Sequence, residues 1–399
     1  MADHSFDASR FSIASSQDID RVVSCSRSKN TVRNSSWCTK LYEDWATWRN
    51  QQSSTTQEND YLVPQLTDLW TAPKADISRA LKHFIFEIRR QDGTEYPPNT
   101  IYNIVCGLAR FIREERPDCN IMDKEDFNFV QFVRALDACM RNLTSRGIGS
   151  HHKRADPISE DSEAKLWDTN AFSLHDGNGL LRAVYFYNCK VFGLRACDKH
   201  RQMQLEQFTF SEDDHGKFVE YTGRGNKVFS GGIRDRKIQN KCVRQYDSDN
   251  NRSVYKILKL YVSRLRSMGV FTGAFYRRPL RNIIPDQPRF ATSPVGVNSI
   301  RKLLPEAASI ADIKGYITAH SGKVTCATRL FRENVDEQLI KSRTGHRSNA
   351  VEAYKRKGPE QEVMLSSLLD PPKPKTKLCN CFHTSIDQID FDFSINVSF

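Results

Sequence analysis

Long apolar runs are missing from this sequence of 399 residues: none approaches the roughly 20 residues that a helix needs to cross a bilayer. The polar start MADHSFDASRFSIASS lacks the apolar stretch of a signal peptide. Paired cysteine spacing is missing too, since the eleven cysteines are scattered, which is typical of free thiols in a reducing compartment. We therefore expect a soluble intracellular protein, neither embedded in a membrane nor stapled by disulfides.

Carboxylate clusters and paired metal-ligand motifs are also lacking. Cys379, Cys381 and His383 cluster as CNCFH, but no second half of a metal site lies near them, so we expect no bound metal. Acidic residues are in the minority: 48 Asp and Glu face 59 Lys and Arg, for a net charge of +11. Since each neutralised phosphate releases counterions, this excess favours a polyanionic partner, nucleic acid first and a membrane surface second.

The hydrophobic residues that are present, 39% of the chain, can supply a sizeable core, and the length allows two or three domains. Residues 1–34 are rich in Ser, Asn and charge without an apolar period, and we expect them to be disordered. In residues 35–143, apolar residues recur at helical spacing in four stretches joined by short connections, which predicts a helical bundle. Residues 144–157 are basic, rich in Gly and end in Pro, as in an interdomain linker, which could also lie along a DNA backbone.

The first of the four helical stretches begins at Ser36. Its helical period places three indoles on one face, those of Trp37, Trp45 and Trp48. Such a face can pack in a core or stack on nucleic-acid bases, and we expect it in the core.

We expect residues 158–360 to form a second domain of mixed structure. Ser159, followed by acidic residues, begins a helix, and LLRAVYFYNCKVFGLR is too apolar throughout to lie on a surface. The stretch QFTFSEDDHGKFVEYTGRGNKVFSGGI alternates in places and contains two turn motifs, which predicts a three-stranded meander. From Ser253 onward helices return, interrupted by a Pro-rich break near residues 279–294 and then expected around 297–305, 323–333, 335–342 and 348–356. Residues 361–399 lose periodicity and are expected to form a tail.

Four separated pieces of the second domain carry cations, imidazoles and a phenol. In FGLRACDKHRQM, Arg195 ends a buried helix, where a guanidinium needs an anion; the alternative is a surface ion pair with Asp198. In the hairpin GRGNKV, a tight turn presents Arg224 or Lys227, which could reach a groove or a phosphate or could simply face water.

The other two pieces lie nearer the C-terminus. TAHSGKVTCATRLFRENV places His320 and Lys323 one helical turn apart, so that both side chains reach the same patch. RTGHRSNAVEAYKRKG places His346 in a turn and Tyr354 eight residues later, in a strongly basic stretch where a tyrosine is not expected to be part of a core.

Together, these pieces supply Arg, Lys, His and Tyr without a carboxylate cluster or a metal-ligand set. Such a set suits metal-free phosphoryl transfer, because cationic donors can stabilise a pentacoordinate phosphate while a phenol supplies the nucleophile. An imidazole and a lysine can carry the protons of the attacking and departing oxygens. We expect no cofactor.

The order of these pieces resembles the tyrosine recombinase and phage integrase superfamily, in which a helical core-binding domain precedes a catalytic domain. YPPNTIYNIVCGLARFIRE, FGLRACDKHRQM, HSGKVTCATRLF and TGHRS resemble more closely the eukaryotic crypton-type recombinases. The zinc finger MYM-type and glutamine-rich families share this recombinase-derived domain. The likeness covers residues 35–360, and TGHRS followed by a tyrosine is its most specific part.

The resemblance implies a role for each matching residue. Arg195 would bind the scissile phosphate, and Tyr354 would be the nucleophile. His320 would begin the His-x-x-Arg box, and His346 would bond a nonbridging oxygen or the tyrosine's oxygen. Lys227 would be the hairpin lysine that protonates the leaving 5′ oxygen, with Arg224 as its competitor.

Two departures from the family pattern bear on cleavage. Lys323 stands where the box has its second Arg, and an ammonium cannot make the bidentate grip of a guanidinium on phosphate. The usual gap from the Gly-His turn to the tyrosine is about nine residues, whereas His346 to Tyr354 is eight. A loss within the helix would turn the phenol by about 100°, and a loss in the turn that precedes it would be harmless.

The fold expected from this resemblance is mainly α with a small antiparallel sheet (α+β): a SAM-like core-binding domain followed by a tyrosine-recombinase catalytic domain. The expected partner is double-stranded DNA, held in a clamp, with a homo-tetramer during recombination and with neither a membrane nor a small-molecule substrate. Nuclear localisation follows from the family and from stretches such as YKRKG. The competing hypothesis is a domesticated, catalytically inactive DNA-binding, chromatin- or transcription-associated protein of the same fold. An RNA-binding helical protein would explain the charge but not the ordered set of residues.

Overall fold

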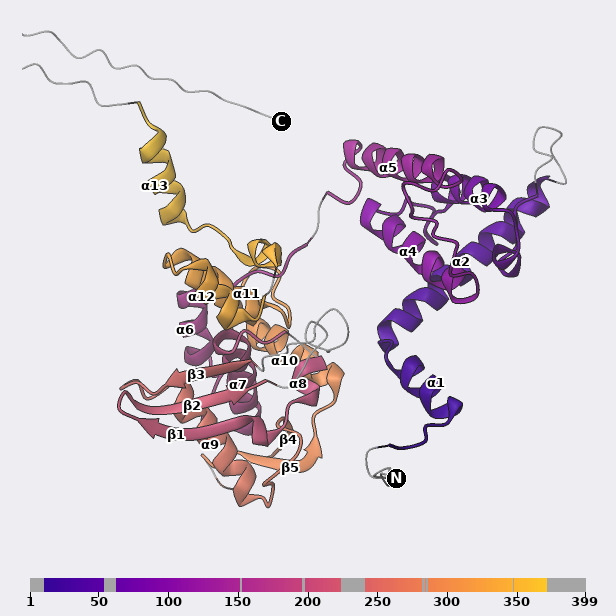
Figure 1. Cartoon of the computed structure of the whole chain (residues 1–399). Coiled ribbons are helices and arrows are strands. Elements are labelled where there is room, and N and C mark those ends of the chain that lie inside the picture. Colours follow the sequence, from indigo (N-terminus) through magenta and orange to yellow (C-terminus); the bar gives the residue numbers. More distant parts are fainter. Residues whose placement is uncertain are drawn as a thin grey trace, which may run out of the picture. The chain divides into compact units, whose positions relative to one another are not determined.

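The computed structural model describes residues 11–53, 62–150, 153–195, 198–223, 241–281, 284, 286–346 and 348–371. The chain forms two compact units, Met1–Lys153 and Arg154–Phe399, which we describe separately (Figure 1). Over the described residues, no helix is both long enough and apolar enough to cross a membrane.

The first unit is helical, as predicted. Its main helices are α2 (Lys29–Ser53), α3 (Lys74–Glu87), α4 (Pro98–Glu115) and α5 (Val130–Ser145), with shorter α1 (Ser16–Cys25) and the 3-10 helix η2 (Thr67–Trp70). In the core, α2 packs against α4 and α3 against α5. Pro98 begins α4, where the missing N–H of a proline costs nothing. Fully buried Phe84, Leu108 and Phe132 fill the space between the helices.

The beginning of this unit differs from the disorder predicted for residues 1–34. Helix α1 is capped by the Ser15 side chain, which accepts a hydrogen bond from Asp18 N at 3.1 Å. Residues 29–34 form the first turns of α2, and Arg110 of α4 donates to Asn34 at 2.8 Å and to Ser35 at 3.0 Å. Composition missed these turns because polar contacts, not apolar burial, hold them.

The expected burial of three tryptophans on one face of α2 is wrong for two of them. Trp45 is 5% exposed, but Trp37 is 42% and Trp48 is 50% exposed. The buried stripe of α2 instead runs through Cys38 and Tyr42, one position further round the helix, because these residues face α4 and α3.

The second unit combines helices with two small sheets in the described residues, so the predicted fold class, mainly α with antiparallel strands, is confirmed. Its helices are α6 (Glu160–Asp168), α7 (Gly177–Val191), α8 (Asp198–Gln202), η3 (Leu205–Gln207), α9 (Val254–Ser267), α10 (Val297–Ile310), α11 (Ser321–Arg332), α12 (Glu337–Thr344), η4 (Asn349–Tyr354) and α13 (Pro359–Leu369). Helix α7 is the buried centre, as its apolar sequence predicted, and contacts α9, α10 and α11 (Figure 1).

The three-stranded sheet has the order β1 (Phe208–Asp213), β2 (Gly216–Thr222) and β3 (Cys242–Tyr246), with antiparallel pairing throughout. The first two strands were predicted correctly. The third was expected within KVFSGGI, which lies outside the described residues, and the strand that pairs with β2 comes later in the chain.

Two further elements were not predicted. A second antiparallel pair, β4 (Arg277–Leu280) and β5 (Arg289–Pro294), lies in the Pro-rich break. A two-stranded sheet has only edge strands, where proline is tolerated because its missing N–H need not join a ladder. Helix α13 lies where a tail was expected, and none of its residues is buried.

Candidate functional site

The candidate site lies where the turn after α7 closely approaches the end of α12. Beyond α7 the chain turns at Gly193, whose φ of +54° is a left-handed value. A Cβ at Gly193 would lie 2.6 Å from Thr344 Cα and 2.7 Å from the Arg343 carbonyl oxygen. Only glycine fits here, so this turn brings the exposed Arg195, two residues on, beside the end of α12. The side chain of Asp198, its alternative partner, lies outside the described residues.

Helix α11 presents the next two side chains. His320 is its N-cap residue, and the preceding carbonyl, that of Ala319, accepts a hydrogen bond from Tyr185 Oη of α7 at 3.0 Å. Lys323, in the first turn, is 5% exposed, and its Nζ donates to the Thr344 carbonyl at 2.9 Å. The same Nζ lies 5.9 Å from the centre of the Tyr354 ring.

Burial and neighbouring cations act on both groups. Burial first, and then the charges of Arg195 and Lys199, lower the pKa of Lys323 to about 8. Partial removal from water lowers the pKa of His320, and the charges of Arg195 and Lys323 lower it further. Arg195 is therefore close enough to act electrostatically on both residues of α11.

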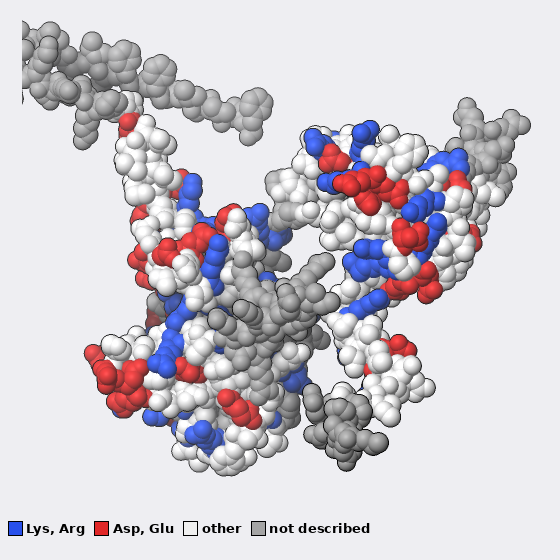
Figure 2. Space-filling view, in the orientation of Figure 1, with Lys and Arg blue, Asp and Glu red and all other residues white. Residues whose placement is uncertain are grey.

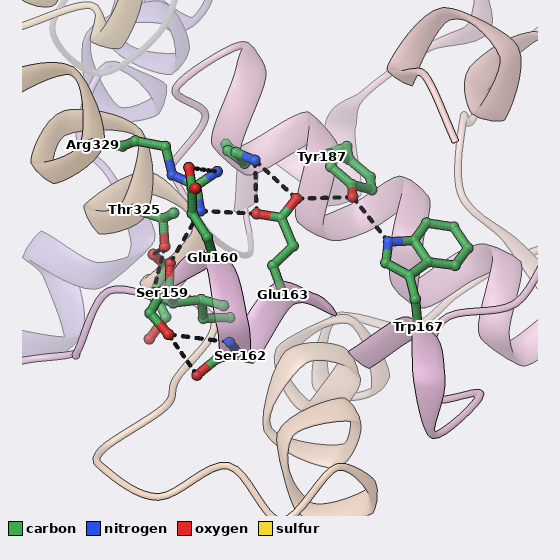
Figure 3. A network of polar contacts seen from close by, with 11 residues as sticks. Ser159, Glu160, Ser162, Glu163, Trp167, Tyr187, Thr325 and Arg329 are labelled. Carbon is green, nitrogen blue, oxygen red and sulfur yellow. Dashed lines mark hydrogen bonds and ion pairs between the residues drawn. The ribbon is translucent and has the colours of Figure 1, made fainter. Parts of the chain in front are cut away.

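A largely buried carboxylate, Glu163 of α6, holds α11 in place (Figure 3). Its Oε1 accepts hydrogen bonds from Tyr187 Oη at 2.9 Å and from Lys190 Nζ at 2.8 Å, both on α7. Its Oε2 accepts from Arg329 of α11 at 2.9 Å. Glu163 thus ties α6, α7 and α11 together, which fixes the helix that carries His320 relative to the helix that leads to Arg195.

The Gly-His turn fixes the tautomer of an imidazole. Helix α12 ends at Gly345, whose φ is +70°, and the Thr344 hydroxyl donates to the Ile340 carbonyl at 2.7 Å. That hydroxyl has one hydrogen, so its lone pair accepts from His346 Nδ1 at 2.8 Å. Nδ1 then carries the proton, and Nε2 has a free lone pair. Nε2 is buried and has no hydrogen-bond partner among the described residues.

The charge state of His346 agrees with this tautomer. Burial lowers its pKa to about 4, with further contributions from the charges of Lys323, Arg195 and Lys241. The ring is therefore neutral at pH 7.

Tyr354 ends the 3-10 helix η4 and is half-buried. Its ring centre lies 5.0 Å from that of His346. Thr328 Oγ1 of α11 donates to the Tyr354 carbonyl at 2.6 Å, which fixes the backbone at this point. The eight-residue spacing therefore does not turn the phenol away from His346.

Lys241 was missed by the sequence predictions. It directly precedes β3, and its Nζ donates to the carbonyl oxygens of Phe192 and, at 2.5 Å, Arg343. Burial, followed by the charge of Lys323, lowers its pKa to about 7. The hairpin candidates Arg224 and Lys227 lie outside the described residues. The available signal was a short stretch, CVRQY, that contains the strand-forming residues Val243 and Tyr246 and begins directly after a lysine.

The charges in this cluster are one-sided. The charged groups that act most strongly on the pKa values of His320, Lys323, His346 and Lys241 are Lys and Arg side chains, opposed only by cysteine thiols, with no Asp or Glu of the described residues among them. Over the visible faces of both units, in contrast, Lys and Arg are interspersed with Asp and Glu (Figure 2). Several cations and an imidazole nitrogen without a hydrogen-bond partner among the described residues form an arrangement that can bind an anion.

Comparisons with known proteins match both units. A family model described as a domain of unknown function, DUF3504, matches residues 157–309, and the QRICH1 domain matches residues 33–143. Human zinc finger MYM-type protein 3 is 21% identical over 262 residues, which cover 62% of this chain and 19% of that protein. Human transcriptional regulator QRICH1 is 21% identical over 175 residues, 42% of this chain and 22% of that protein. The matched region thus spans only about a fifth of these curated relatives.

Solved structures similar to the chain are recombinases and integrases. A lambda integrase dimer bound to a COC′ core site has 15% identity and a TM-score of 0.43, covering 90% of this chain and 98% of that chain. XerA recombinase has 13% identity and a TM-score of 0.37, covering 84% and 99%. These structures are of the kind that the motifs resemble, recombinases and integrases. In sequence, the relatives are the zinc finger MYM-type proteins and QRICH1, as the motifs indicated.

Proposed function

We propose that the protein binds double-stranded DNA and that its second unit cleaves and rejoins a strand through Tyr354, as a tyrosine recombinase does. One observation carries the proposal: the unpartnered, buried Nε2 of a neutral His346 belongs to a ring 5.0 Å from the ring of Tyr354, among cations. A phenol is a weak nucleophile until a base removes its proton. The free lone pair of this nitrogen can accept that proton once the negative charge of a bound phosphate offsets the cations that hold the pKa of His346 at about 4.

The proposed reaction balances within the residues of the site. The Tyr354 hydroxyl gives its proton to His346 Nε2, and the phenolate oxygen bonds to phosphorus while the bond from phosphorus to the 5′ oxygen breaks. A lysine ammonium gives the departing 5′ oxygen its proton. Lys241, with a pKa of about 7, joins Lys227 as a candidate for this step. Arg195 would bind the nonbridging oxygens, and rejoining reverses the steps on another strand.

A second candidate function is binding without cleavage, in transcription or chromatin. The observation that favours it is Lys323, because its ammonium is buried and donates to the Thr344 carbonyl where the family has a guanidinium that grips phosphate. One relative, QRICH1, is named a transcriptional regulator. We expect nuclear localisation with either function, and assembly as a tetramer on DNA only with strand cleavage and rejoining.

The experiment that separates the two functions traps covalent protein on nicked duplex DNA. The full chain is incubated with duplexes in which a nick lets the cleaved fragment diffuse away, and adducts are resolved on a denaturing gel. We expect an adduct from the parent protein and none from Tyr354→Phe, which removes only the hydroxyl. Lys323→Arg should increase the yield if the missing guanidinium limits cleavage. DNA binding with no adduct from the parent or from Lys323→Arg would leave only the binding function.

A further inference from the structure

The segment that leads into the second unit contacts the chain just beyond Tyr354. Asp156 Oδ1 accepts a hydrogen bond from Arg356 Nη1 at 2.7 Å, and the Ala155 carbonyl accepts from Arg356 Nη2 at 2.7 Å. The planar guanidinium fork therefore grips two acceptors of the same short segment, residues 154–158. Arg356 lies two residues after Tyr354, so this grip fixes the backbone that carries the phenol.

The carboxylate of Asp156 is itself held from the other side. Its Oδ2 accepts from Tyr316 N at 2.7 Å, and Asp156 N donates to the Tyr316 carbonyl at 3.0 Å. A Cβ at Gly315, whose φ is +107°, would lie 2.9 Å from Asp156 Oδ2, so this approach requires glycine. With side chains 27% and 39% exposed, Arg356 and Asp156 are more sheltered than most surface ion pairs.

The other anchors of the Tyr354 segment come from the body of the unit. Thr328 of α11 binds the Tyr354 carbonyl, and Arg332 of α11 donates to the Arg356 carbonyl at 3.2 Å. Lys355 pairs with Glu337 of α12. Asp156 differs from these anchors because it lies in the stretch by which the chain arrives from the first unit. A shift of that stretch would reach Tyr354 through Arg356.

We propose that Asp156 is a positioning residue for Tyr354. Through Arg356 it holds the phenol beside His346, and it makes the placement of Tyr354 depend on the position of residues 154–158. The consequence for cleavage rests on the proposed function, but the placement of the phenol does not.

The placement is measured without any reaction. 3-Fluorotyrosine is incorporated at position 354 of the full chain, and its ¹⁹F resonance is recorded in the parent protein and in Asp156→Ala. We expect Asp156→Ala to shift or broaden the resonance. Glu362→Gln is the matched control, since it removes a nearby carboxylate that pairs with Lys357 at 3.5 Å but does not touch residues 154–158. It should leave the resonance in place.

Arg356→Lys tests the fork itself, because it keeps the charge but lacks the planar pair of N–H groups that faces both acceptors, and we expect a smaller shift of the resonance than in Asp156→Ala. In the trapping assay, with the natural tyrosine, Asp156→Ala should lower the rate of adduct formation about 10- to 100-fold, the usual cost of a nucleophile displaced by about 1 Å. DNA affinity should be unchanged.

The outcomes separate the two ideas. An unchanged ¹⁹F resonance in Asp156→Ala, with circular dichroism showing a folded protein, overturns the positioning role whether or not the parent cleaves DNA. A moved resonance in a protein that forms no adduct supports the positioning role and rejects cleavage. An unchanged adduct rate in Asp156→Ala overturns the positioning role in the reaction.

Discussion

Gly193→Ala tests how strongly the close approach of the Arg195 turn to the end of α12 constrains the second unit. Gly193 has a φ of +54°, where an L-residue costs about 1–2 kcal/mol. The added Cβ would also meet two backbone atoms at 2.6 and 2.7 Å, Thr344 Cα and the Arg343 carbonyl oxygen. Backbone cannot rotate away as a side chain can, and overpacking of this kind costs about 1–3 kcal/mol. We expect a total loss of about 2–5 kcal/mol in the free energy of unfolding.

Gly269→Ala is the matched control for this substitution. Gly269 lies in the same unit with a φ of +78°, but its Cβ would meet nothing within 4 Å, so only the conformational cost of about 1–2 kcal/mol applies. Amide hydrogen exchange of peptides from α7 measures the opening free energy of the second unit within the full chain. The reasoning is refuted if Gly193→Ala destabilises α7 no more than Gly269→Ala does.

Two further predictions concern the charges of the second unit. Burial lowers the pKa values of Lys241 and Lys323 to about 7 and about 8, so between pH 7 and pH 10 the unfolded chain binds more protons and the unit's stability should rise with pH. Phosphate bound at the site would raise both pKa values again, so DNA binding at pH 8 should take up protons. Calorimetry would then give a binding enthalpy that differs between Tris and HEPES buffers. Equal enthalpies in the two buffers would contradict DNA binding at these lysines. Glu163→Gln should destabilise the unit by up to about 3 kcal/mol, the lower end of the cost of breaking a buried ion pair, because it removes the charge that two partly buried cations share. Glu160 is the control, because its carboxylate is 80% exposed and Glu160→Gln should cost less than about 1 kcal/mol. Thermal melts compare the two variants, and equal losses of stability would reject the role of Glu163 in holding α6, α7 and α11 together.

The main helices of both units, such as α3, α4, α5 and α7, could be predicted because each has an apolar period or an apolar run of its own. The apolar pattern did not predict the structure where contacts other than apolar burial determine it. Helix α1 and the start of α2 are held by a cap and by Arg110, and the buried stripe of α2 is one position away from the tryptophans that suggested it. Large aromatic residues suggest a core, but the neighbouring helix decides which face is covered.

The candidate residues were predicted as a set from the motifs, but Lys241 was not among them, and the predicted Lys227 lies outside the described residues. The third strand was expected just after Lys227, whereas β3 begins at Cys242 and the Gly223 amide donates to the Lys241 carbonyl at 2.7 Å. A period of two identifies many strands, but CVRQY of β3 has no such period and was not recognised. Strand pairing depends on contacts between residues far apart in the sequence, so the sequence pattern did not indicate that Lys241 lies beside Phe192 and Arg343.

The spacing between His346 and Tyr354 could not be interpreted from the sequence for a related reason. The number of residues gives the direction of the Tyr354 side chain only if the rotation per residue is known. Here η4 is a 3-10 helix, which turns by about 120° per residue, whereas an α-helix turns by about 100°. Contacts with α11 and α12 favour this helix type, because Val351 of η4 is fully buried in a small cluster with Ala327 of α11 and Ile340 of α12. Together with the bond from Thr328 to the Tyr354 carbonyl, this cluster fixes both ends of the turn. The phenol is therefore placed by α11 and α12, so a chain one residue shorter than the family pattern can still bring its tyrosine to the imidazole.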